Sequence, residues 1–256
     1  MAPISPPGWY VISLRPQGGH AGLRAAAARR GGGLLALSPW RLQGRDDRDT
    51  RHALRNALAA DRVLFTSPAA VRHAAALATL KPRRGQVWIA VGSGTATALR
   101  RFGIDDVIAP ARMDSEGLLD LPQLRGLRGH SVGLVTAPQG REALAPALRR
   151  RGARVLRADV YERIAIVPAA RARQRLRELD RPACVALSSG GALQALLAVL
   201  VPPERAALLR IPAIVASERL AAQARAAGFR RVRLATGPRP AQLASAAAEA
   251  IGVRFH

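Results

Sequence analysis

The feature that most limits the fold of this chain is an internal repeat with a period of about 122 residues. The tripeptide Pro-Gln-Gly at residues 16–18 recurs at residues 138–140, and each copy follows a short β-rich run. Further along, the segment DRVLFTSPAAV corresponds to PACVALSSGGAL, and Ser93 corresponds to Ser217. These matches keep the same order in both copies. Two related units of about 120 residues are therefore the simplest account of the chain.

Within each copy, short apolar strands alternate with helices. VLF leads into SPAAVRHAAALATL, WIAV into GSGTATALRRFG, CVAL into SSGGALQALLAVL, and AIVA into SERLAAQARAAG. Near-continuous apolar strands of this length, each followed by a helix, are typical of a parallel sheet covered on both faces. The sequence predicts an α/β fold.

The charge is high but dispersed. The chain has 40 Lys and Arg residues against 17 Asp and Glu, a formal net charge of +23, and Lys81 is its only lysine. The arginines fall on nearly every predicted helix, and aromatic residues make up 4%. A protein that reads nucleic acid more often concentrates charge on one face and adds aromatic platforms. We therefore expect a solvated basic surface that attracts small polyanions, with no nucleic-acid partner.

Cysteine and histidine usage narrows the chemistry. Cys184 is the only cysteine, which excludes an internal disulfide, favours a reducing compartment and makes the cytoplasm the default location. The five histidines have no ligand spacing, so no metal site is predicted. The first residues do not read as a signal peptide. The uncharged stretch 182–203 reads as strand, turn and helix, so no membrane partner is expected.

Small hydroxyl residues stand at the turns between strands and helices. In such sheets ligands collect beyond the carboxyl ends of the strands, where helix N-termini offer free N–H groups to anions. The alternative is that these residues only cap helices. The turn at residues 92–94 has neither the lysine of a Walker A phosphate-binding loop nor the third glycine of a dinucleotide-binding fingerprint. The GxSxG elbow of a serine hydrolase is also absent from the sequence. The hydroxyl residues of these turns are Thr66, Ser67, Ser93, Thr95, Ser188, Ser189 and Ser217.

Tyr161 lies in the alternating segment ADVYERIAIVP. Its phenol can donate and accept a hydrogen bond, which suits a general acid beside a departing oxygen. Ordinary packing of the ring in a strand is the alternative.

In this order, the segments LFTSPAAVRH, IAVGSGTATALRRFG, SEGLLDLPQL, VGLVTAPQGREALAPALRRRGARVLRADVYER and IVASERLAAQARAAGF closely resemble the uroporphyrinogen-III synthase family. The resemblance implies two flavodoxin-like parallel-sheet lobes joined by a two-segment hinge, around a cleft that opens and closes, in a monomeric protein. One lobe would combine residues 1–38 with 166–256, and the other would take residues 44–158. Residues 39–43 and 159–165 would form the hinge.

The resemblance also implies an activity. Members of this family are cyclising hydro-lyases that need no cofactor. They convert linear hydroxymethylbilane, a small polycarboxylate, to uroporphyrinogen III with loss of water and inversion of ring D, in haem biosynthesis. The accepted route passes through an azafulvenium cation and a spiro intermediate. Two alternatives remain open: a non-catalytic bilobed protein that binds a small polyanion, and a basic protein associated with nucleic acid.

Site residues follow from the resemblance position by position. Tyr161 matches the tyrosine thought to assist departure of the hydroxyl group. The matching residues expected to bind substrate are Arg15, Thr66, Ser67, Thr95, Ser115, Glu116, Ser188 and Ser189, with Ser93 and Ser217 added from the turns. The Ser217-Glu218-Arg219 turn departs from the small, hydroxyl-rich pattern of its counterpart. Pro146 also departs from the pattern, and we expect it to kink or shorten its helix.

Overall fold

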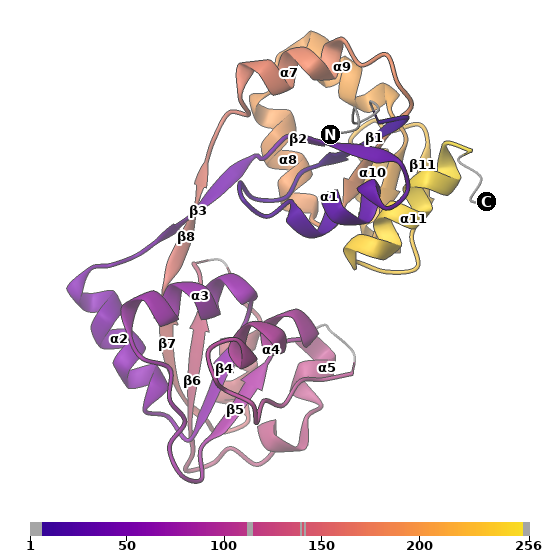
Figure 1. Ribbon diagram of the computed structural model, residues 1–256. Helices are drawn as coiled ribbons and strands as arrows, with labels where there is room; N and C mark the ends of the chain where they lie inside the picture. The colour runs from indigo at the N-terminus through magenta and orange to yellow at the C-terminus, as the bar shows by residue number, and fades with distance from the viewer. Residues whose placement is uncertain (1–6, 112–114, 139, 141, 253–256) are drawn as a thin grey trace, which may run out of the picture. The chain divides into compact units, whose positions relative to one another are not determined.

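The computed structural model describes residues 7–111, 115–138, 140 and 142–252. The chain forms two compact units (Figure 1). Unit 1 comprises the residues up to Arg41 and those from Ile164 onward, and unit 2 comprises Leu42–Arg163. Unit 1 is therefore built from two separate pieces of the chain.

Unit 1 contains a five-stranded parallel sheet. Its order is β11-β10-β9-β1-β2, which in chain order is the doubly wound arrangement 2-1-3-4-5. The strands are β1 (Trp9–Ser13), β2 (Gly32–Ala36), β9 (Ala183–Leu187), β10 (Ala213–Val215) and β11 (Val232–Leu234).

Helices cover both faces of this sheet. Residues alternate between faces along each strand, so Ile12 and Val185 pack into one apolar cluster while Val11 and Cys184 pack into another. The second cluster is closed by α1 (Ala21–Ala28) and α11 (Pro240–Ala250). The first cluster is closed by α7 (Ala170–Arg177), α8 (Gly190–Val199), α9 (Pro202–Arg210) and α10 (Glu218–Ala226).

Unit 2 contains a four-stranded parallel sheet of order β5-β4-β6-β7. A parallel bridge from Ile108 to Ile89 extends it beyond β5. The strands are β4 (Arg62–Phe65), β5 (Val87–Ala90), β6 (Ser131–Thr136) and β7 (Arg154–Asp159). The helices are α2 (Arg48–Leu58), α3 (Pro68–Leu77), α4 (Ser93–Arg100), α5 (Ser115–Leu119), the short 3-10 helix η1 (Pro122–Leu124) and α6 (Leu144–Arg150).

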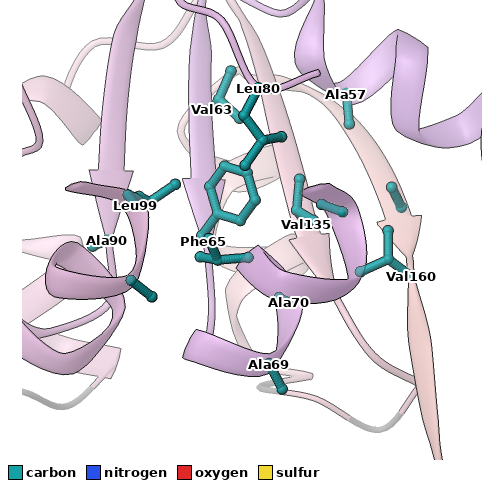
Figure 2. Close-up of a cluster of buried hydrophobic side chains, with 14 of the residues drawn as sticks. Ala57, Val63, Phe65, Ala69, Ala70, Leu80, Ala90, Leu99, Val135 and Val160 are labelled. Atoms are coloured by element: carbon teal, nitrogen blue, oxygen red, sulfur yellow. The ribbon is translucent and has the colours of Figure 1, made fainter. Parts of the chain in front are cut away.

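The core of unit 2 also has two sides. Figure 2 shows the side on which Val63 and Phe65 meet α2, α3 and α4, with Val135 and Val160 beside them. On the other side, Leu64 packs with apolar residues of α5 and α6. Both faces of the sheet are thus buried, as the near-continuous apolar strands predicted.

The two sheets repeat one strand order. Strands β4, β5, β6 and β7 stand at the repeat positions of β9, β10, β1 and β2, and the orders β5-β4-β6-β7 and β10-β9-β1-β2 match strand for strand. This confirms the duplication and the predicted α/β fold. The sequence copies and the sheets do not coincide, however. Strands β1 and β2 belong to the first sequence copy but complete the sheet that contains β9 and β10 of the second copy.

Strands β3 (Trp40–Gly44) and β8 (Tyr161–Ala165) pair in a separate two-stranded sheet. Their ends are tied by hydrogen bonds from Ile166 N–H to Pro39 O, 3.0 Å, and from Arg45 N–H to Val160 O, 3.1 Å. The chain passes from one unit to the other within these two strands.

Two local features complete the fold. Helix α6 has seven residues, and Pro146 is its third, so the proline stands in the first turn, where its missing N–H is not needed. The helix is short, as Pro146 led us to expect.

Across the described ranges, no helix combines the length and apolar character needed to cross a membrane.

Candidate functional site

In unit 2, the predicted catalytic tyrosine meets one of the predicted turn serines. Tyr161 is the first residue of β8, and Ser67 stands two residues after β4. The Ser67 Oγ and the Tyr161 Oη lie 3.0 Å apart, and either can donate. When Ser67 donates, the phenolic proton is left for another acceptor.

Local sequence explains why Ser67 is held in place. It has extended backbone angles as the N-cap of α3, and its Oγ accepts a hydrogen bond from the Ala70 N–H, 3.0 Å. Pro68 begins the helix, where its fixed φ suits the first turn. Ser67 thus connects the positive end of a ten-residue helix to the Tyr161 hydroxyl.

His73, on the same helix, supports the ring of Tyr161. The two rings stack with centroids 5.2 Å apart and an interplanar angle of 20°. A Cβ on Gly44 would lie 2.9 Å from the His73 Nδ1, so the glycine leaves room for the imidazole. Burial, and secondarily the charge of Arg72, lowers the pKa of His73 below its usual 6.5. The neutral form of the imidazole is therefore favoured over the charged form more than in a free histidine.

Tyr161 itself is 5% exposed and belongs to the core of unit 2. Ser67 is half-buried, so it is the more exposed partner of the hydroxyl pair. The ring of Tyr161 therefore packs as a core residue, as the alternative interpretation expected, and its hydroxyl takes part in a polar pair, whereas its role as a general acid stays a prediction.

The other predicted residues of unit 2 lie in different environments. Thr66 is buried and donates to the Thr136 Oγ1, 2.8 Å, so its hydroxyl joins the ends of β4 and β6. Ser93 is exposed as the first residue of α4, whereas Thr95, two residues later, is 2% exposed. A ligand can reach Ser93 directly, but not Thr95.

The side chains of Ser115 and Glu116 lie outside the described residues. Their backbone forms the first two positions of α5.

In unit 1, the predicted residues Arg15, Ser188 and Ser189 line one small hollow of about 100 Å³. Arg15 follows β1, and the serines follow β9 and open α8. Ser189 caps that helix, with its Oγ accepting from the Ala192 N–H at 3.3 Å. Trp40 closes the hollow.

Arg15 is the unusual member of this hollow. Its Nε is buried and has no hydrogen-bond partner within the described part of the chain. Burial lowers the pKa of its guanidinium. A buried, unsatisfied cationic donor costs free energy until an acceptor arrives, and a carboxylate is the acceptor that fits the guanidinium best. The hollow can therefore bind an anionic group.

Ser217 caps α10, its Oγ accepting from the Leu220 N–H at 3.4 Å. It does not line the hollow around Arg15.

His20 was not predicted from the sequence. This buried histidine, 7% exposed, bonds through Nδ1 to the Ser13 Oγ, 2.9 Å, and through Nε2 to the Ser38 Oγ, 2.8 Å. Burial lowers its pKa, and the charges of Arg24 and Arg15 lower it further. No spacing in the sequence marks this contact, because only the fold brings residues 13, 20 and 38 together.

His73 was also missed, although a signal existed. Its position one turn after Ala69 and Ala70, both buried, places it at the edge of the packed face of α3.

Within the ranges described here, no three His, Cys, Asp or Glu side chains gather in a way that could hold a metal ion.

The family model described as uroporphyrinogen-III synthase HemD matches residues 22–245. The uroporphyrinogen-III synthase of Escherichia coli K12 is 31% identical over 150 residues, which cover 58% of this chain and 61% of that protein. The Salmonella typhimurium LT2 enzyme is 32% identical over 174 residues, covering 64% of this chain and 70% of that protein.

Solved structures agree at the level of the fold. A mutant uroporphyrinogen III synthase of Thermus thermophilus aligns with a TM-score of 0.60 at 21% identity, covering 92% of this chain and 96% of that one. The uroporphyrinogen-III synthetase of Helicobacter pylori 26695 aligns with a TM-score of 0.59 at 16% identity, covering 96% and 99%.

Proposed function

The chain belongs to the uroporphyrinogen-III synthase family, and on that premise we propose that it closes hydroxymethylbilane to uroporphyrinogen III. The reaction is a cyclisation with loss of water and inversion of ring D, a step of haem biosynthesis. The observation that carries the proposal is the Tyr161–Ser67 hydroxyl pair at the N-terminus of α3.

The first step is departure of the terminal hydroxyl group. Tyr161 donates its proton to that oxygen as the C–O bond breaks, and water leaves. The electron pair of the pyrrole nitrogen forms the azafulvenium cation. Ser67 donates a hydrogen bond to the phenolate that remains, and the positive end of α3 favours this negative charge.

The later steps are carbon–carbon bond changes. The cation is attacked by the substituted carbon of ring D, the spiro intermediate fragments, and the ring recloses in the inverted sense. The proton lost on final aromatisation returns to the phenolate, so the enzyme ends as it began. Uncatalysed closure gives the other isomer, so positioning of the substrate decides the product.

Carboxylate recognition is the second part of the proposal. Arg15, whose buried Nε has no partner among the described residues, binds a carboxylate of the substrate, and Ser188 and Ser189 line the same hollow. In unit 2, Ser93 presents an exposed hydroxyl at the start of α4. Thr95 is buried and Ser217 lies outside the Arg15 hollow, so we give both a lesser part.

The proposed chemistry transfers protons and rearranges carbon–carbon bonds, so it requires no electron carrier and no other cofactor. We further propose that the protein acts as a monomer in the cytoplasm. Cys184 supports a reducing location, because it is the only cysteine and no internal disulfide can form.

The test is an assay with hydroxymethylbilane that separates the type III and type I isomers. We expect the full chain to give type III. Tyr161→Phe should lower kcat tenfold or more, since removal of a general acid often costs about 10²-fold. Tyr10→Phe is the matched control, because Tyr10 is the only other tyrosine and its hydroxyl bonds Arg175.

An isomer ratio equal to the spontaneous one would overturn the proposal. Tight binding of hydroxymethylbilane without any type III product would favour the alternative, a binding protein for a small polyanion.

A further inference from the structure

Unit 1 carries a basic surface at the amino ends of its strands. Arg181 precedes β9, Arg210 precedes β10, and Arg230 and Arg231 precede β11. Because these strands are parallel, their amino ends share one edge of the sheet. Arg15 follows β1 at the opposite edge, roughly 15 Å away for a five-residue strand. This basic surface is therefore separate from the candidate site.

The surface is hollowed. Three adjoining hollows of about 240, 660 and 370 Å³ meet there, and Arg231 lines all of them. Arg210 lines the first two, and Arg230 lines the last two. The arginines that line the three hollows are Arg177, Arg181, Arg210, Arg230, Arg231 and Arg233. We call this set the arginine surface.

No carboxylate among the described residues lines any of these hollows. Likewise, within the described chain, no member of the arginine surface forms an ion pair with Asp or Glu. Glu178 and Asp180 are close in sequence, but Glu178 accepts a hydrogen bond from Gln174 instead. Among the described residues, no ion pair therefore offsets the mutual repulsion of these arginines.

Part of the surface is ordered. The Arg231 guanidinium donates to the Arg210 carbonyl oxygen, 2.9 Å, and both residues line the same two hollows, so this bond restrains the guanidinium there. A fixed guanidinium loses less conformational entropy when it binds an oxyanion. Two parallel N–H groups match the two oxygens of a carboxylate or phosphate.

We propose that the arginine surface binds a multiply charged oxyanion, a small molecule that carries several phosphate or carboxylate groups. Among the residues that the structure describes, no aromatic side chain lines the hollows, so nothing described there stacks on a nucleobase. The remaining walls are aliphatic, among them Leu176, Leu209 and Ile211. Recognition is thus directed to the oxyanion groups themselves. This proposal stands independently of the proposed function.

The experiment is calorimetric titration of the full chain at low salt with two probes, inorganic tripolyphosphate and citrate. We expect binding of at least one probe, and the tighter one identifies phosphate or carboxylate as the preferred group. Arg210→Ala with Arg231→Ala should weaken that binding by about tenfold or more. Arg210→Lys with Arg231→Lys keeps the charge but loses the planar fork, so it should weaken binding by several-fold.

The control is Arg83→Ala with Arg84→Ala. These two exposed arginines precede β5 in unit 2, and their removal changes the net charge by the same amount. We expect this pair to lower affinity by less than about twofold, the effect of general charge alone. Equal losses from both alanine pairs, or no binding of either probe, would overturn the proposal. Turnover of hydroxymethylbilane should be the same in all these variants.

Discussion

The imidazole of His73 lies against the ring of Tyr161, 5.2 Å between centroids and 20° from parallel. The phenol is held on one side by this stack and at its hydroxyl by Ser67. Both contacts come from α3, so one helix orients the proposed acid in two ways. His73 touches the tyrosine and acts through it, which makes it a positioning residue.

We expect His73→Ala to lower kcat by up to about tenfold, because small errors in the placement of a reacting group cost rate steeply. His73→Phe keeps a ring of similar shape against Tyr161 and should retain most of the activity. Measurement of kcat for type III product, with thermal melts of both variants, checks this. If the phenylalanine variant were as slow as the alanine variant, ring stacking on Tyr161 would not be the cause of the effect of His73 on kcat.

Ser67→Ala removes two contacts at once. The cap of α3 is lost, which should lower the free energy of unfolding by about 0.5–2 kcal/mol. The hydrogen bond to Tyr161 is lost too, so kcat should fall. Chemical denaturation and steady-state kinetics measure the two effects separately.

Asp47→Ala is the matched control for Ser67→Ala. Asp47 caps α2 in the same unit, accepting from the Thr50 N–H at 2.7 Å. It should lower stability and leave kcat unchanged. If Asp47→Ala slowed turnover as much as Ser67→Ala, the kinetic effect of Ser67 would reflect stability alone.

Much of the fold followed from local patterns. The apolar strand and the hydroxyl cap after it predicted β4 with α3 and β9 with α8, because each signal requires only neighbouring residues. The repeat predicted two equivalent sheets. Which strands complete which sheet could not be derived, since β1 and β6 are both fully buried and either could pair beside β9. Only the family resemblance indicated the exchange.

The site was less predictable, because its contacts join residues that are far apart in the sequence. Capping by Ser67, Ser189 and Ser217 follows from sequence, whereas the Ser67–Tyr161 contact joins residues far apart in the chain. The pattern also could not separate an exposed turn hydroxyl from a buried one. Ser93 and Thr95 share one turn, and the helix points only the first outward.

Arg15→Met should separate binding from stability. The Nε of this half-buried side chain is buried and has no partner among the described residues, so removal of the guanidinium should leave the free energy of unfolding unchanged or raise it. Loss of a charge-assisted hydrogen bond should raise KM for hydroxymethylbilane by about tenfold, with little change in kcat.

The control for Arg15 is Arg29→Met, which removes an exposed arginine at the end of α1 in the same unit. We expect its KM to stay within about twofold of the wild type, since an exposed charge far from the hollow is screened. A marked loss of stability in Arg15→Met would instead mean that the arginine holds the fold together.

The His20 contacts predict a loss of stability in acid. In the folded chain the pKa of His20 lies below 6.5, lowered by burial first and by the charges of Arg24 and Arg15 next. The unfolded chain therefore binds a proton more readily, and stability falls as pH drops below about 6.5 and on through the folded pKa. Protonation would also make both ring nitrogens donors, so neither serine could donate to the ring.

His20→Gln keeps polar groups between Ser13 and Ser38 but does not titrate. We expect its free energy of unfolding to change less between pH 7.5 and pH 5 than that of the wild type, as measured by denaturant titration at each pH. His73 also has a lowered pKa, so a part of the acid sensitivity should remain in the variant. His52→Gln, at an exposed position on α2, should show the full wild-type dependence. An unchanged pH profile in His20→Gln would place the acid sensitivity elsewhere, because the predicted effect requires the imidazole between these two serines to be the group that takes up the proton.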